Sequence, residues 1–328
     1  MDGIIVQTFP GQLPAGRSVR WTDARVRGLR DAWAEAGGSV ASAGRALACG
    51  FTGAGRGADV PWAPARSVPG DDGSGGETAM RDACDDWRRF DAEKIPSKAS
   101  TPQLDGFLAA VQEATAAATP LRLLDVGCGT GRLSRRLYDR GFSVLGVDVN
   151  PTAVRAAERL SVPVDATGRS LEFVAGDFAA DPCPFVDDGP FDVVVCQLVL
   201  SIIGGVRQRE NLLRHLRAHL RPRGWLYLSA SGVSDTINPG YARLYAEDFP
   251  STGEQHSYLS RDERGAVLYM THHFTADELV AQLEGAGFDR IDVRTEREAS
   301  SRRPEEAAYF HYATCRAGPA AARSPVRS

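Results

Sequence analysis

The chain has 328 residues, a formal net charge of −4 and 43% hydrophobic residues, which is enough for a full-sized buried core. Because positive and negative charges are nearly balanced, the composition argues against a dedicated nucleic-acid or membrane-surface binder. The six cysteines form no C-x-x-C pair, and we interpret all of them as reduced thiols rather than disulfides or zinc ligands. No secretory signal is visible, and no apolar run approaches the roughly 18–20 residues of a membrane span. We therefore expect a cytoplasmic protein without a metal site.

The first 79 residues differ in composition from the rest. They are rich in Gly, Ala, Arg, Pro and Ser and hold too few apolar residues to offset the entropy cost of ordering a chain. We predict a low-complexity, disordered N-terminal extension over residues 1–79, apart from one helix near residues 22–36. An alternative is that translation starts at Met80. We expect the folded domain to occupy residues 80–317 and a disordered tail to occupy residues 318–328.

From Met80 onward, apolar runs of strand length alternate with helical patterns. Such alternation predicts a parallel sheet covered by helices on both faces. A capping box, Thr275 to Glu278, opens the last helix. The expected strands are 121–126, 142–147, 171–175, 191–197, 225–230, 290–296 and 307–316, with a short additional strand at 266–271, and the expected helices are 102–116, 130–140, one from 151, 209–220 and 275–285.

A run of three alternating glycines joins the first expected strand to a helix, in the segment Leu121-Arg-Leu-Leu-Asp-Val-Gly-Cys-Gly-Thr-Gly131. Glycine lets backbone amides approach a ligand with no Cβ in the way, and the helix start points unpaired N–H groups at it. The dinucleotide fingerprint would require glycine or alanine at position 132, where Arg132 stands. No G-x-x-x-x-G-K-[ST] occurs, so a triphosphate loop is not expected.

Acidic residues lie at the ends of three successive expected strands. They are Asp125, Asp148 and Asp177. Because the carboxyl ends of parallel strands lie along one edge of a sheet, these acids should converge on a single crevice. An acid after the second strand can accept both hydroxyls of a ribose. The other interpretation of Asp148 is helix capping, since Asn150 and Pro151 follow directly.

The glycine segment resembles motif I of the class I S-adenosylmethionine-dependent methyltransferases, and the resemblance extends over roughly residues 84–317. It implies a doubly wound α/β fold, with a mostly parallel seven-stranded sheet and an antiparallel C-terminal strand, and S-adenosyl-L-methionine as cofactor. In that family the acid at Asp177 bonds the adenine amino group. The cofactor-binding residues that we expect are Asp125, Gly127, Cys128, Gly129, Gly131, Asp148, Val149, Gly176, Asp177, Phe178 and Gln197.

The absence of two motifs limits the classes of molecule that could accept the methyl group. No N/D-P-P-Y/F motif follows Gln197, and no Pro-Cys dipeptide occurs at that point, so the resemblance does not extend to enzymes that methylate DNA bases. An insert at 232–264 carries several aromatic residues suited to a substrate pocket. We predict methyl transfer by in-line SN2 displacement to an O-, N- or C-nucleophile of a small molecule, for example a secondary metabolite. A methyltransferase acting on RNA or protein, and a non-catalytic S-adenosylmethionine-binding scaffold, stay open as alternatives.

Some nucleophiles require a general base, and the candidates are Tyr241, His272 and His273. The alternative is that the two histidines pack at a strand-to-helix join. The arginine-rich stretch from Arg207 to Arg223 has its leucines on one face, so we expect a solvated surface helix rather than an RNA site. We therefore expect a small-molecule substrate with no nucleic-acid or membrane partner, and the oligomeric state stays open.

Overall fold

The computed structural model describes residues 87, 88, 90, 91, 101–115, 119–185, 189–262, 264–300 and 306–318. All of them belong to one compact unit within residues 62–328. The predicted N-terminal extension, the helix near residues 22–36, the possible start at Met80 and nearly all of the predicted tail lie outside the described residues.

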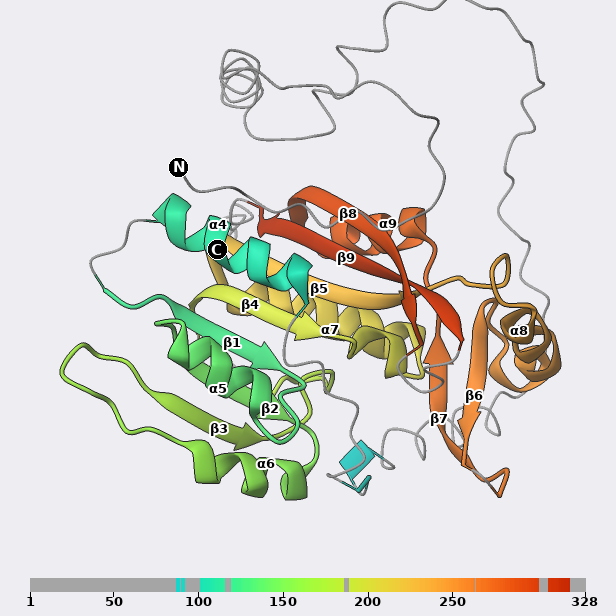
Figure 1. Ribbon diagram of the computed structural model, residues 1–328, viewed down its shortest axis with the longest axis horizontal. Coiled ribbons are helices and arrows are strands. Elements are labelled where there is room, and N and C mark those ends of the chain that lie inside the picture. The colour runs from blue at the N-terminus through green and yellow to red at the C-terminus, as the bar shows by residue number, and fades with distance from the viewer. Residues whose placement is uncertain are drawn as a thin grey trace, which may run out of the picture. The chain divides into compact units, whose positions relative to one another are not determined.

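A seven-stranded sheet forms the centre, with the strand order β3-β2-β1-β4-β5-β9-β8 (Figure 1). β1 pairs in parallel with β2 and β4, whereas β9 is antiparallel to β5 and β8. This arrangement confirms the predicted fold class. The strands are β1 (Arg122–Val126), β2 (Ser143–Asp148), β3 (Leu171–Ala175), β4 (Phe191–Gln197), β5 (Leu220–Gly232), β8 (Phe288–Ala299) and β9 (Ala307–Ala317).

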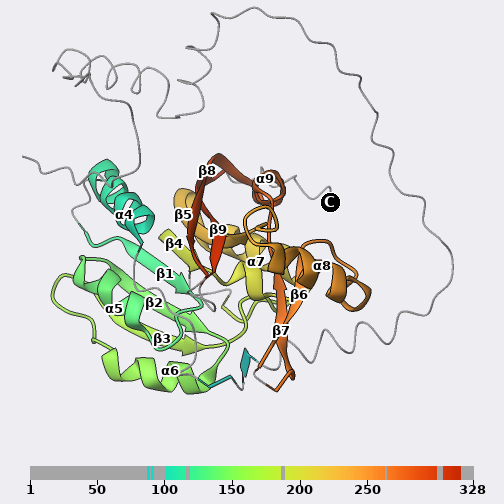
Figure 2. The ribbon, with the colours of Figure 1, turned by 45° about the vertical axis from the view of Figure 1, so that its right-hand side comes forward.

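Helices cover both faces of the sheet and create two separate cores (Figures 1 and 2). Leu123 packs with residues of α4, α5 and α6, whereas its neighbour Leu124 packs with residues of α7 and α9. A strand that is buried on both faces needs apolar residues at successive positions, as this one has. The helices are α4 (Pro102–Thr115), α5 (Arg132–Asp139), α6 (Pro151–Ala157), α7 (Val206–His219), α8 (Pro239–Thr252) and α9 (Ala276–Gly285), with 3-10 turns η2 (Glu158–Leu160) and η3 (Leu200–Ile202).

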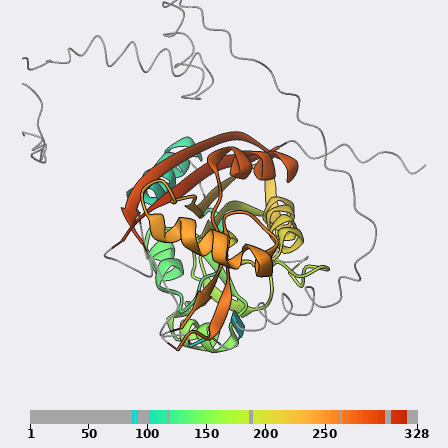
Figure 3. The same cartoon turned by 90° about the vertical axis from the view of Figure 1, so that its right-hand side faces the viewer.

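The insert at 232–264 is more ordered than the sequence indicated. It contains α8 and β6 (Ser257–Arg261), and β6 pairs antiparallel with β7 (Val267–His272) in a separate two-stranded sheet. Together, α8, β6 and β7 lie beyond the carboxyl end of the central strands (Figures 1 and 3). We call these three elements the hairpin layer.

Two local predictions about caps have different outcomes. Asn150 caps α6, because its Oδ1 accepts hydrogen bonds from the amides of Thr152 at 2.9 Å and Ala153 at 3.0 Å. Only half of the expected capping box forms at α9. The Thr275 hydroxyl accepts from the Glu278 amide at 3.1 Å, but the Glu278 carboxylate contacts the His272 Nε2 at 3.0 Å instead. A buried histidine thus competes successfully for that carboxylate.

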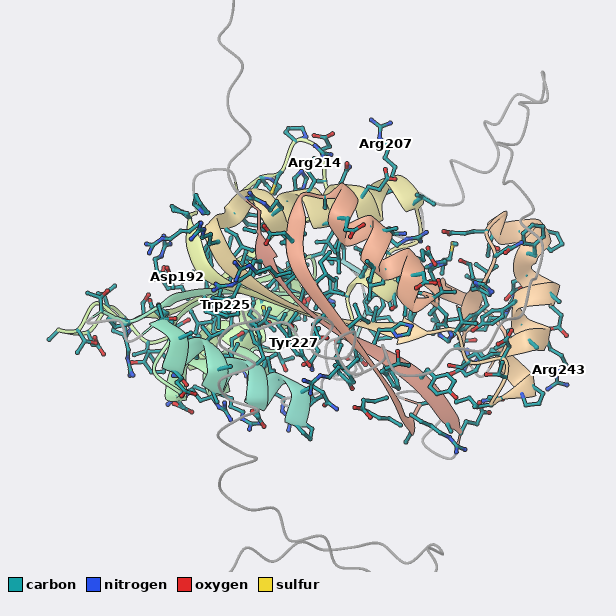
Figure 4. The ribbon with its side chains drawn as sticks, turned by 90° about the horizontal axis from the view of Figure 1, so that it is seen from above. Asp192, Arg207, Arg214, Trp225, Tyr227 and Arg243 are labelled. Carbon is teal, nitrogen blue, oxygen red and sulfur yellow. The ribbon has the colours of Figure 1, made fainter. Side chains whose placement is uncertain are left out.

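The prediction that the arginines of α7 are solvated is wrong for Arg209. Arg207 and Arg214 point outward from α7 (Figure 4), but Arg209 has 0% of its side chain exposed. Its guanidinium donates to the Ile203 carbonyl at 3.0 Å and forms an ion pair with Glu254. Because Glu254 follows α8, no sequence pattern within α7 signals this buried pair.

None of the helices in the described ranges has the length and apolarity needed to span a lipid bilayer. Cys128, Cys183, Cys196 and Cys315 are free and buried, and the described residues contain no group of His, Cys, Asp and Glu side chains able to hold a metal ion.

Gly131→Ala should destabilise the fold. The residue has a φ of +79°, and an added Cβ would lie 2.8 Å from the Phe173 ring and 2.9 Å from the Ala157 Cβ. We expect chemical denaturation to show a loss of about 2–4 kcal/mol in the free energy of unfolding, from overpacking and left-handed strain. The matched control is Gly106→Ala in α4, where a Cβ meets nothing within 4 Å and the helix should gain about 0.5–1 kcal/mol. Equal effects of the two substitutions would contradict this account.

Candidate functional site

A cavity of about 530 Å³ is lined by residues at the carboxyl ends of the central strands and by residues of the hairpin layer. Its size is typical of small-molecule sites. Most of its lining falls into two halves, one at the strand ends and one around the hairpin layer, and the second half also includes Ser300 after β8 and Phe310 of β9. The strand-end half contains Gly127, Asp148, Val149, Gly176, Asp177, Phe178 and Gln197. The hairpin half contains Tyr241, Leu244, Tyr258, Ser260, Arg261, Tyr269, Thr271, His273, Ser300 and Phe310.

Gly127 forms the wall of the strand-end half with a φ of +78°. A Cβ at this position would lie 2.2 Å from the Val199 Cγ2, and Val199 also lines the cavity. The glycine is thus required by close packing within the chain as well as by backbone conformation. Not all loop amides face a ligand, because the Gly129 amide donates to Asp148 at 2.8 Å and the Gly131 amide donates to the Cys128 carbonyl at 3.0 Å.

Asp148 joins the glycine loop to the next helix. Its Oδ2 accepts the Gly129 amide at 2.8 Å and its Oδ1 accepts the Asn150 amide at 2.8 Å. Burial raises the pKa of this carboxyl above its ordinary value, while the two amide hydrogen bonds oppose that shift. Each carboxylate oxygen has a second lone pair, so Asp148 keeps acceptor capacity for ligand hydroxyls. Asn150, rather than Asp148, is the cap of α6.

Asp177 and Phe178 line the same half of the cavity. The Asp177 Oδ1 accepts the Ala179 amide at 2.9 Å, and its other carboxylate oxygen lies 3.6 Å from the Arg88 guanidinium. Phe178 is 5% exposed, and its ring stacks on Phe185 with a centroid separation of 5.6 Å. The side chains offer an acceptor beside an apolar surface, which suits a polar edge of a flat aromatic ligand.

Four of the predicted cofactor residues, Asp125, Cys128, Gly129 and Gly131, are not among the residues that line the cavity. Asp125 is 1% exposed and accepts a hydrogen bond from the Ser134 hydroxyl at 2.6 Å. Burial raises the pKa of Asp125 to about 7, the Ser134 bond lowers it, and Asp148 adds a smaller increase. Asp125 therefore lies beneath the loop, where it supports the start of α5.

The three predicted catalytic residues lie in different surroundings. His272 is 2% exposed and does not line the cavity, because its Nδ1 lies 2.8 Å from the Ser257 hydroxyl and its Nε2 lies 3.0 Å from Glu278. This geometry matches the packing alternative. His273 and Tyr241 do line the cavity, and the Tyr241 hydroxyl lies 3.3 Å from that of Ser300.

Trp87 is a cavity residue that sequence reasoning did not select. Its ring packs on Phe90 at 4.9 Å and on Tyr269 at 4.5 Å between centroids. The Asn150 Nδ2 donates to the carbonyls of both Trp87, at 3.1 Å, and Phe90, at 2.7 Å. The Trp87 Nε1 is buried without an acceptor in the described part of the chain. The aromatic spacing Trp87-Arg-Arg-Phe90 was the only sequence signal for this contact.

Residues 90–293 match a family model described as a methyltransferase domain. The chain belongs to this family. A protein from Methanosarcina mazei, described as an S-adenosylmethionine-dependent methyltransferase, superimposes with a TM-score of 0.56 at 26% identity, covering 67% of this chain and 99% of that one. The Ubiquinone biosynthesis O-methyltransferase of Xanthomonas axonopodis pv. citri is 31% identical over 215 residues, which cover 63% of this chain and 77% of that protein.

A second methyltransferase relative matches this chain over a shorter segment. The mitochondrial Ubiquinone biosynthesis O-methyltransferase of Schizosaccharomyces pombe is 33% identical over 116 residues. The match covers 35% of this chain and 39% of that protein, so this chain aligns with well under half of that relative's length. The shared segment therefore does not transfer the whole protein's activity.

The predicted family, fold and cofactor are confirmed by these matches. The cavity lining also fits S-adenosylmethionine by its chemistry. Asp148 and Asp177 offer acceptors to hydroxyl and amino groups, and the buried Trp87 Nε1 offers a donor that has no acceptor in the described part of the chain. Which individual side chains bind the cofactor remains a prediction.

Asp125 should make the stability of the fold depend on pH. Because its pKa is about 7 in the folded protein and about 3.8 for an ordinary aspartate in an unfolded chain, the folded state binds its proton more tightly. Stability contributed by this group is therefore present at about pH 4 and is lost as the pH rises to about 7. We expect Asp125→Asn to raise the free energy of unfolding at pH 8, by at least about 1 kcal/mol, but much less at pH 4. Chemical denaturation at a series of pH values tests this prediction, with the exposed Asp292→Asn as the control. An equal dependence of the unfolding free energy on pH in the wild type and in Asp125→Asn would refute it.

Asp148→Asn should weaken S-adenosylmethionine binding. The amide keeps the size of the side chain but removes the charge that faces the cavity. We expect calorimetry to give a loss of about 1.5–3 kcal/mol, the range for hydrogen bonds to a charged group. Asp139→Asn, an exposed residue paired with Arg135, is the control and should bind normally. Unchanged affinity in folded Asp148→Asn would contradict the ribose assignment.

Proposed function

We propose that this protein transfers a methyl group from S-adenosylmethionine to a small-molecule acceptor by in-line SN2 displacement. The observation that carries the proposal is one continuous cavity, whose strand-end half has acidic residues at strand ends and whose hairpin half has aromatic rings and hydroxyls. A shared cavity allows two ligands to meet without exposure to bulk water. When bound, S-adenosylmethionine supplies a methyl group already activated on a sulfonium.

The chain's own residues then have two tasks, binding and alignment. In this proposal Asp148 accepts the ribose hydroxyls, Asp177 accepts the adenine amino group, and Phe178 packs against the ring. Tyr241 and Ser300, whose hydroxyls lie 3.3 Å apart, orient the acceptor in the hairpin half. Alignment of this kind lowers the barrier because the two reactants no longer pay the entropy of meeting.

The acceptor's size is suggested by the hairpin layer. Tyr258, Tyr269 and Phe310 enclose the hairpin half, which suits a flat organic molecule better than an extended polymer. Two relatives are named for O-methylation in ubiquinone biosynthesis, which supports a small acceptor here as well. Cytoplasmic localisation remains a prediction, and one of these relatives is named as mitochondrial.

The test is methyl transfer from isotopically labelled S-adenosylmethionine to panels of phenols, amines, RNA and proteins, with calorimetry of cofactor binding alongside. We expect cofactor binding and labelled product with one small-molecule class. Labelling restricted to RNA or protein would contradict the proposed substrate class. Cofactor binding with no labelled product from any panel would instead support the non-catalytic scaffold.

A further inference from the structure

A buried hydrogen bond links α8 to the residue that follows β7, beside the cavity. The Tyr245 hydroxyl lies 2.6 Å from the His273 Nδ1, and the two side chains are 8% and 3% exposed. His273 lines the hairpin half of the cavity. No described residue hydrogen-bonds to its other nitrogen, Nε2, so that nitrogen is left for whatever the cavity holds.

The direction of this bond follows from the needs of the buried phenol. Burial raises the pKa of Tyr245 above its ordinary value and keeps the phenol protonated. A buried hydroxyl hydrogen needs an acceptor, and the His273 Nδ1 is the acceptor that the described part of the chain places within hydrogen-bond distance. The phenol's hydrogen is therefore directed to the His273 Nδ1. A neutral imidazole has one acceptor and one N–H nitrogen. The hydrogen of His273 therefore resides on Nε2.

His273 is also a poor proton acceptor. Burial is the largest cause that lowers its pKa, followed by His272, His256 and His311, and the pKa falls to about 3. His273 therefore has little capacity to take a proton from a bound phenol, whose ordinary pKa is about 10. The ring stays neutral at physiological pH and presents a donor to the cavity.

Aromatic rings lie against His273. The Tyr241 and Tyr258 rings lie 4.8 Å and 5.3 Å from its ring, measured between centroids. Arg261 is the lining residue of the hairpin half that carries a positive charge, and both of its terminal nitrogens donate to Asp248, at 2.9 and 2.6 Å. Its charge is already compensated. A ligand atom beside His273 therefore meets a neutral N–H donor among aromatic rings.

We propose that His273 donates a hydrogen bond from Nε2 to the ionised nucleophilic oxygen of a phenol-type acceptor, with Tyr245 as the positioning residue that fixes the donor. An ionised oxygen has three lone pairs, so it can accept from His273 and still attack the methyl carbon. A neutral amine has one lone pair, which such a donor would occupy. The site thus selects oxygen over nitrogen nucleophiles. This inference rests on the proposed methyl transfer.

The reaction balances without a protein base. The phenol loses its proton to water, the oxygen lone pair forms the O–C bond, and the C–S bond breaks with its electron pair retained by sulfur. The products are the methyl ether and S-adenosylhomocysteine. Fixed donors aimed at an oxyanion are effective in such water-poor sites.

The first experiment needs no turnover. In ¹⁵N-labelled protein, the imidazole signals of His273, assigned by their loss in His273→Phe, should show a hydrogen on Nε2 and no change between pH 5 and 8. Tyr245→Phe should shift the ring toward a mixture of the two neutral forms. The matched control, Tyr312→Phe, removes a buried hydroxyl that bonds Glu298 elsewhere and should leave the signals unchanged. A hydrogen on Nδ1, or a charged ring at pH 6, would overturn the proposal.

The second experiment uses 4-nitrocatechol, whose absorbance reports its ionisation, bound together with S-adenosylhomocysteine. Its ionisation should shift to lower pH on binding to the wild type and to His273→Asn, which keeps an N–H donor, but not to His273→Phe. Absence of binding, or an equal shift in all three proteins, would contradict the proposal.

Kinetic measurements then test the role of His273 separately from the proposed methyl transfer. With labelled S-adenosylmethionine, kcat/KM for catechol and 4-nitrocatechol should rise with pH at midpoints set by each phenol's own acidity. His273→Phe should reduce kcat by about 10²-fold, the usual effect of removing one oxyanion donor, while S-adenosylhomocysteine affinity is retained. The same midpoint for both phenols, or transfer to 1,2-phenylenediamine in preference to them, would contradict the role of His273 but not the proposed methyl transfer. No transfer to any acceptor class would count against the proposed function itself.

Discussion

One carboxylate, that of Asp148, connects the parts from which the cavity is built. It accepts the amide of Gly129 from the glycine loop and the amide of Asn150 from the start of α6. Asn150 in turn caps α6 and holds the carbonyls of Trp87 and Phe90. Because a buried carboxylate is costly without partners, these hydrogen bonds stabilise one arrangement of loop, helix and aromatic cover together. Loss of any one partner would loosen the others.

The two halves of the cavity have separate structural origins. The strand-end half lies at the carboxyl edge of the central sheet, where β1 and β4 are buried at successive positions and pack against both cores. The hairpin half comes largely from α8, β6 and β7, which form their own small sheet and helix. Sequence changes in the hairpin layer can therefore alter the hairpin half of the cavity without disturbing the strand ends. Such a division allows one fold to support different sites.

A buried polar network attaches the hairpin layer to the central domain. Arg209 of α7 pairs with Glu254 after α8, and the Ser257 hydroxyl lies 3.3 Å from the same carboxylate. His272 of β7 lies between Ser257 of β6 and Glu278 of α9. The network therefore joins α7, β6, β7 and α9. Such a network is stable only when nearly all of its groups find partners, which restricts the hairpin layer to one position. The adjacent residue, His273, is thereby held at the cavity wall.

The sequence by itself determined the sheet, its main strand boundaries, the glycine turn, the Asn150 cap and the converging acids at Asp148 and Asp177. These features depend on local periodicity and on the rule that parallel strands end at one edge. Only the tertiary structure decided that Arg209 is buried, that Glu278 turns to His272, that Trp87 reaches the cavity, and that His273 rather than His272 faces it. Each of these outcomes depends on a partner far away in the chain. Side chains of the same type carry no local pattern that distinguishes a buried, paired position from a solvated one.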